Sequence, residues 1–164
     1  MKSIWERWAE NTSPTRSGKH GNMSFHGMAA FSYDVIVAVK YPDPDGSDGS
    51  GGSGGTLVVA DNGIFKSRTT TAHKKKYVSA VPSWWKKVYV DMCTDSGSLC
   101  LIDPGTRLTT VEGLLNCHEC MTKGVMKMLD EVDSNKAWNA CVKAVAKLNA
   151  LGAFLDLPAV NCAI

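Results

Sequence analysis

The sequence predicts an α+β fold: a small antiparallel sheet of two hairpins with a short helix, followed by a C-terminal helical hairpin. Short segments rich in β-branched and aromatic residues occupy the first two thirds of the chain, as is typical of strands. The last third instead has apolar residues at the spacing of amphipathic helices. We therefore expect a small α+β domain over residues 1–105 and a helical hairpin over residues 106–164 that packs on it.

The composition fits an ordinary globular domain. Of the 164 residues, 44% are hydrophobic and 21% are charged, enough apolar material for a core without obligatory disulfides. No run approaches the roughly 18 apolar residues of a membrane helix, and the opening MKSIWERWAE lacks the apolar stretch of a signal peptide. These features predict a cytoplasmic protein without a membrane partner, in which the six cysteines need not form disulfides.

The N-terminal segment predicts one short helix and one hairpin. Ser3, with a glutamate three residues later, matches a capping box that opens a helix. Residues 14–24 are polar, contain glycine and proline and show no periodicity, so we expect a loop there. Residues 28–33 and 35–41 are rich in aromatic and β-branched residues, which predicts two strands joined by a tight turn near Asp34.

A second hairpin follows a glycine-rich segment. Residues 43–55 hold six of the fifteen glycines and no apolar side chain, which predicts a flexible loop inside the domain. After it, residues 56–61 and 64–67 flank Asn62-Gly63, a dipeptide that favours a two-residue hairpin turn. We expect these two segments to pair as strands.

A short helix and one more strand complete the first domain. Three threonines precede residues 72–81, where a helix is expected to end at Pro82. Lysines 74–76 in this helix fan over about 200°, so at most two of them can point at one partner. Residues 86–92 alternate between polar and apolar side chains, which predicts a strand.

The last third predicts two antiparallel helices. Thr109 and Glu112 match a capping box at the start of a long amphipathic helix. A second helix is expected to begin near Ser134 and to end at Gly152. Two such helices, joined by a short turn, should pack on each other and on the sheet.

Positive charge is concentrated in one segment. Residues 64–92 contain seven basic residues and one acidic residue, interleaved with tyrosine and tryptophan, a pattern that suits a polyanion. The alternative is a solvated basic face with both tryptophans in the core. Under the first interpretation we expect phosphate contacts from Arg68, Lys74, Lys75, Lys86 and Lys87, and base stacking on Trp84 or Trp85.

Two patterns are candidates for other chemistry. Cys117 and Cys120 have the C-x-x-C spacing of a zinc ligand pair or a redox dithiol, and Cys93 and Cys100 would complete four zinc ligands. On a helix, however, the side chains of the first pair diverge, so structural cysteines are the third interpretation. His73 is a candidate general base, but only Asp61 is acidic and placed to approach it. We therefore assign no catalytic residue, metal ligand or cofactor.

Four motifs carry a resemblance to a known family. They are N-T-S-P-T-x-S-G-x-x-G-N-M-S-F-x-G at residues 11–27, F-S-Y at 31–33, V-I-V-A at 35–38 and S-x-T-T-T-A-H-K at 67–74. Over residues 11–90 the chain resembles an uncharacterised small domain family of bacteriophage and metagenomic proteins. The resemblance implies a viral origin, and hence the host cytoplasm as location, but no activity.

Three functions remain open from the sequence. The basic and aromatic segment at residues 64–92 favours a non-catalytic, phage-type accessory protein that binds nucleic acid. One alternative is a protein-interaction module that inhibits or redirects a host factor through the helical hairpin or the tryptophan pair. The other is a metal-dependent enzyme built around His73 or the two cysteines at 117 and 120.

Overall fold

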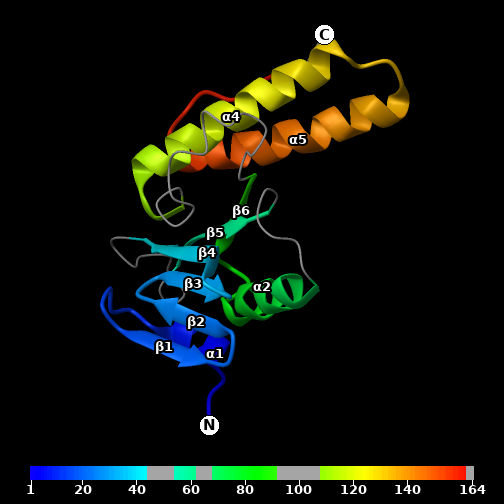
Figure 1. Ribbon diagram of the computed structural model, residues 1–164. Coiled ribbons are helices and arrows are strands. Elements are labelled where there is room, and N and C mark those ends of the chain that lie inside the picture. Colours follow the sequence, from blue (N-terminus) through cyan, green and yellow to red (C-terminus); the bar gives the residue numbers. More distant parts are fainter. Residues whose placement is uncertain (44–53, 62–67, 92–107, 162–164) are drawn as a thin grey trace.

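The computed structural model has the predicted α+β fold (Figure 1) and describes residues 1–43, 54–61, 68–91 and 108–161. Ten helices and strands lie in these ranges. The strands are β1 (Ser17–His20), β2 (Met23–His26), β3 (Ala29–Ser32), β4 (Val35–Pro42), β5 (Gly55–Ala60) and β6 (Lys86–Val90). The helices are α1 (Ile4–Glu10), α2 (Arg68–Ala80), α4 (Val111–Asp130) and α5 (Asn135–Phe154).

The six strands form one sheet in chain order, from β1 to β6. Each strand is antiparallel to its neighbour except β5 and β6, which are parallel and are connected across the sheet by α2. The sheet is therefore mostly antiparallel, with one βαβ unit at its end. That unit places the carboxyl ends of β5 and β6 side by side.

The structure corrects the loop predicted at residues 14–24. That segment contains β1 and the start of β2, which pair through a two-residue turn at Gly21-Asn22. Most residues of β1 are exposed and none is apolar in the sequence SGKH, so there is no apolar alternation to reveal the strand. The predicted strands at 28–33 and 35–41 are confirmed as β3 and β4.

The pairing predicted for the second hairpin, between residues 56–61 and 64–67, is wrong. Its first strand is β5, whereas the strand expected at residues 64–67 lies outside the described residues. Both hydrogen-bonding edges of β5 are occupied, one by β4 and the other by β6. The glycine-rich loop and the predicted domain boundary at residue 105 also fall largely outside the described ranges.

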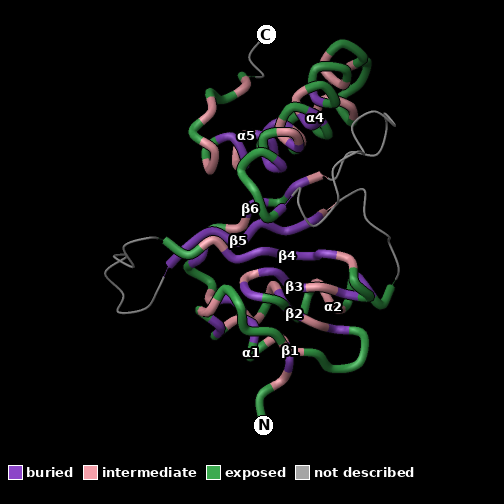
Figure 2. The backbone as a smooth tube through the Cα atoms, turned by 60° about the vertical axis from the view of Figure 1, so that its left-hand side comes forward, coloured by how far each residue is buried: buried purple, intermediate pink, exposed green. Residues whose placement is uncertain are grey.

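Each face of the sheet has its own apolar cluster, and the helical hairpin lies at the β5–β6 end of the sheet (Figure 2). α1 and α2 cover one face, where Trp8, Phe25 and Tyr77 are buried. α4 and α5 pack on the other face, against Ile36 and Val88 among others. The helical hairpin thus packs on the sheet, as expected.

The C-terminal helices begin and end close to their predicted limits. Thr110, rather than Thr109, caps α4 by accepting a hydrogen bond from the Gly113 amide. Ser134 caps α5 in the same way, as predicted. Gly152 does not end α5, since the helix continues to Phe154.

Candidate nucleic-acid interface

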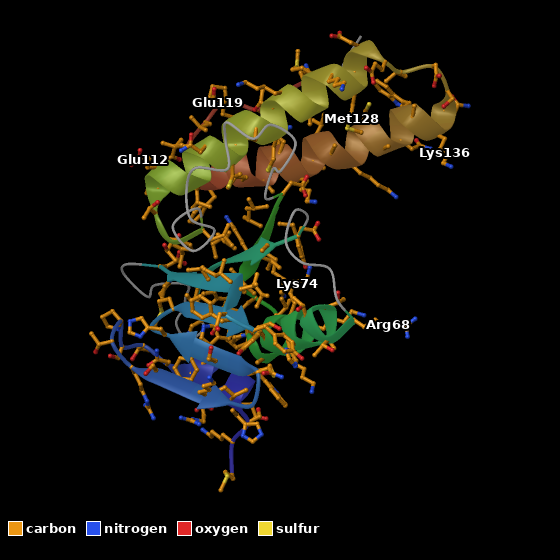
Figure 3. The ribbon with its side chains drawn as sticks, viewed as in Figure 1. Arg68, Lys74, Glu112, Glu119, Met128 and Lys136 are labelled. Carbon is orange, nitrogen blue, oxygen red and sulfur yellow. The ribbon has the colours of Figure 1, made fainter. Side chains whose placement is uncertain are left out.

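The orientation of α2 decides which of its basic residues are accessible. The helix buries Thr70 and Tyr77 against the sheet. With 3.6 residues per turn, the opposite stripe carries Arg68, Lys75 and Ser79, and all three are exposed. Figure 3 shows Arg68 projecting from the end of the helix into solvent.

Lys74 points in a different direction from its two neighbours. Its ammonium donates to the backbone oxygen of Ala60 at 3.2 Å and lies 3.7 Å from a carboxylate oxygen of Asp61. In Figure 3 it stands between α2 and the β5–β6 end of the sheet. Lys75 and Lys76 instead line one common cavity. The three lysines therefore point in different directions around α2, as predicted. Lys75 and Lys76 face the cavity, and Lys74 faces the end of β5.

The remaining predicted residues do not lie together. Lys86 and Lys87 are consecutive in β6, so their side chains point to opposite faces of the sheet. Only Lys87 lies on the face that α2 covers, because Lys86 shares its face with Val88 and Val90 of the other cluster. Of the seven residues expected at the interface, Arg68 and Lys75 are thus the two that share one exposed surface.

The two adjacent tryptophans have different environments. Trp84 is 58% exposed, whereas Trp85 is 7% exposed and belongs to the apolar cluster under α2. Gly55 makes room for the Trp85 ring, since a Cβ atom at that position would lie 2.8 Å from it. Base stacking, expected on either tryptophan, is therefore open to Trp84 and not to Trp85.

The cavity beside α2 contains residues that the sequence analysis did not select. It has a volume of about 470 Å³ and is open to solvent. Lys76 lies over the ring of Trp5 there, with its nitrogen 4.8 Å from the ring centre. The lining residues are Trp5, Glu6, Lys75, Lys76, Ser79 and Ala80. No local pattern signals this site, because Trp5 and Lys76 come from helices far apart in the chain.

His73 belongs to a small polar cluster on the same helix. Its Nδ1 lies 2.8 Å from the hydroxyl of Ser32, and its ring is stacked on Tyr33 with 6.0 Å between the ring centres. Burial, and secondly the positive charge of Lys76, lower the pKa of His73. Since Ser32 is fully buried, its contact with His73 holds the imidazole in place rather than presenting a nucleophile to solvent.

An ion network occupies the carboxyl ends of the two parallel strands. Asp61 follows β5 and Asp91 follows β6, and Lys147 of α5 lies between them at 2.5 and 2.6 Å. Burial by itself lowers the pKa of Lys147, but hydrogen bonds to both carboxylates outweigh burial and raise it. The second carboxylate that a metal site near Asp61 needs is thus present, but the ammonium groups of Lys147 and Lys74 balance the charge of the pair.

The cysteine motif lies inside the helical hairpin. Cys117 and Cys120 are buried thiols of α4, and Cys141 of α5 is another. His118 points along a different direction, toward Gly152 of α5, where a Cβ atom would lie 3.2 Å from its Nε2. Cys93 and Cys100, the other two ligands of the zinc interpretation, lie outside the described residues.

Comparisons with known proteins assign neither a family nor a function to the chain. The chain matches no protein-family model, no curated protein and no solved structure. Within the described ranges, no three histidine, cysteine or acidic side chains converge as metal ligands would. None of the described helices combines the length and the apolar character that a membrane span requires.

Proposed function

We propose that the protein is a non-catalytic, phage-type accessory protein that binds nucleic acid through the outer side of α2. We call this region the α2 surface and define it by Trp5, Arg68, Lys75 and Lys76. Arg68, Lys75 and Lys76 form no ion pair with any described residue, whereas Lys74 and Lys147 are paired with carboxylates. Cations without a carboxylate partner are the ones that can neutralise phosphates and release counterions.

Two aromatic residues, the half-buried Trp5 and the exposed Trp84, support the same proposal. Trp5 lies under Lys76, and Trp84 is exposed four residues after the end of α2. Bases can stack on such rings while lysine and arginine contact the backbone. Glu6, which also lines the cavity, opposes binding of a polyanion and limits the net positive charge of the site.

Neutralising the α2 surface should weaken binding of DNA and reduce its salt dependence. We expect the double variant R68Q/K75Q to bind a labelled oligonucleotide more weakly than the wild type between about 50 and 200 mM salt. If both cations contact phosphates, the slope of log affinity against log salt should fall by about 1.4 for single strands. Fluorescence anisotropy measures both quantities.

The matched control is K136Q/K143Q, which removes the same charge from exposed positions on α5. We expect this variant to keep the wild-type slope. Absence of binding to either single- or double-stranded DNA at low salt would overturn the proposal. An equal loss in the control would show that net charge, rather than the α2 surface, governs binding.

A second candidate function has one observation in its favour. Val111, Leu115 and Met126 of α4 are between 42% and 64% exposed and share one side of that helix. Exposed apolar side chains on one side of a helix are typical of protein contacts, which favours a module that inhibits or redirects a host factor. Capture of a host protein that survives nuclease and high salt would favour this function over the first.

A further inference from the structure

We infer that the α2 surface, together with Tyr33 beside His73, is a stacking platform that selects single-stranded over double-stranded nucleic acid, with Tyr33 and Trp5 as the two aromatic positions. This inference rests on the proposed function and specifies the substrate class. It depends on two ring pairs that lie next to each other: Tyr33 with His73, and Trp5 with Lys76.

The two pairs are adjacent because their α2 members are three residues apart. Side chains at this spacing are neighbours on a helix surface, with about 5–6 Å between their Cβ atoms. The electrostatic effect of Lys76 on His73 agrees with this proximity. Each α2 residue then receives an aromatic ring from another element: Tyr33 from the β3–β4 turn and Trp5 from α1.

Tyr33 is held in an unusual backbone conformation that presents its ring. The turn between β3 and β4 has two central residues, Tyr33 and Asp34, with φ angles of 50° and 66°. Positive φ at both positions is the geometry of a type I′ turn, which favours asparagine and glycine and disfavours a bulky residue. The turn nevertheless carries a tyrosine, which is 49% exposed. A strained residue with an exposed ring is typical of a functional position.

The ring of Tyr33 is supported before any ligand arrives. It stacks on His73 with 25° between the ring planes, and His73 is in turn held by the Ser32 hydroxyl. One side of the tyrosine ring thereby faces the imidazole, which restricts the side chain. A base that stacks on the other face pays little additional entropy, because the ring is already ordered.

The Trp5 pair provides the second position. Lys76 covers the ring centre at 4.8 Å, beside a cavity of about 470 Å³ that also contains Lys75 and Ser79. A volume of this size lies within the range of small-ligand sites. The lysines are placed to contact the phosphate of a nucleotide whose base lies beside the half-buried ring of Trp5.

Stacking on exposed rings distinguishes single strands from duplexes. In a duplex each base is already stacked on its neighbours, so only phosphates and base edges are available to a protein. Single strands expose the faces of their bases, and each base stacked on an aromatic side chain contributes about 1–3 kcal/mol. Arg68, Lys75 and Lys76 would attract both forms, but the two rings favour the single strand.

The test compares Tyr33→Asn with Tyr33→Phe. Asparagine suits positive φ, so the first variant should fold while lacking the ring, and phenylalanine keeps the ring. We expect Tyr33→Asn to weaken binding of a single-stranded oligonucleotide by about 5-fold to 100-fold. Duplex binding should change by less than about twofold, and Tyr33→Phe should retain the wild-type preference.

The matched control is Tyr89→Asn, which removes an exposed tyrosine from β6 without touching either ring pair. We expect it to leave the preference for single strands unchanged. Equal binding of both forms by the wild type, or an unaltered preference in Tyr33→Asn, would overturn the stacking inference while the proposed function stands. Absence of binding to either form would instead overturn the proposed function itself.

Discussion

Replacing Trp8 by alanine should lower the free energy of unfolding by about 3–5 kcal/mol. Trp8 is completely buried at the centre of the cluster between α1, α2 and the sheet. Its ring meets that of Tyr77 edge to face at 5.2 Å, and its indole N–H donates to the Met28 oxygen at 2.9 Å. The variant therefore loses packing and one of the two hydrogen bonds that the Met28 oxygen accepts, the other coming from the Lys40 amide at 3.0 Å.

Urea titration followed by far-UV circular dichroism measures this loss. The free energy of unfolding of a domain of this size is about 5–15 kcal/mol, so the expected loss is a large fraction of the total stability. Trp84→Ala is the control, because its ring is mostly exposed and its removal should cost less than about 0.5 kcal/mol. If the two variants unfold at the same urea concentration, α1 and α2 do not share the core described above.

Lys40 should make stability rise with pH in the alkaline range. Its side chain is buried under α1, where the ammonium donates to the backbone oxygens of Trp8, Ala9 and Asn11 at 2.6, 3.0 and 2.6 Å. Burial lowers the pKa of Lys40 from 10.5 to about 8. Between these two values the unfolded chain holds a proton that the folded protein has lost.

The sign of the effect follows from this difference in bound protons. Because the unfolded state binds more protons between about pH 8 and 10.5, the contribution of Lys40 to the free energy of unfolding increases with pH there, by on the order of 3 kcal/mol in total. Below about pH 8 both states are protonated and the contribution is constant. Burial also raises the pKa of Tyr41 to about 12, which lowers stability as pH rises above about 10.

The measurement is therefore the difference between the wild type and Lys40→Met in urea titrations from about pH 7 to 10. We expect the wild type to gain stability relative to the variant above about pH 8. Lys143→Met, at an exposed position of α5, is the control. Its free energy of unfolding should change with pH as that of the wild type does. If the free energy of unfolding had the same pH dependence in the wild type and in Lys40→Met, this result would contradict the burial of an ionisable lysine under α1.

Local patterns predicted most elements of this fold, whereas pairing over long distances was not accessible from them. The apolar spacing in α4 and α5 and the alternation in β6 depend only on nearby residues, so the sequence shows them directly. The edge strand β1 buries no side chain and was missed for that reason. The parallel pairing of β5 with β6 depends on the crossover connection that contains α2. No turn motif in the sequence predicts that crossover.

The candidate site was predicted at the level of a segment but not of individual side chains. The excess of basic residues at 64–92 pointed to Arg68 and Lys75, and the structure places both on one exposed stripe of α2, while their role in binding stays a prediction. It did not distinguish Lys74, which forms contacts with residues 60 and 61. Trp5 and Tyr33 lie outside that segment and reach α2 only through the tertiary fold.

The central claim, that nucleic acid binds on the α2 surface, is tested most directly by the indole N–H signals of the five tryptophans in an NMR titration. With a single-stranded oligonucleotide of about ten nucleotides, we predict that the signals of Trp5 and Trp84 shift. The signals of buried Trp8 and Trp85, and of Trp138 in α5, should stay in place. A shift of the Trp138 signal without a shift of the Trp5 signal would contradict the claim, as would the absence of any indole shift at low salt.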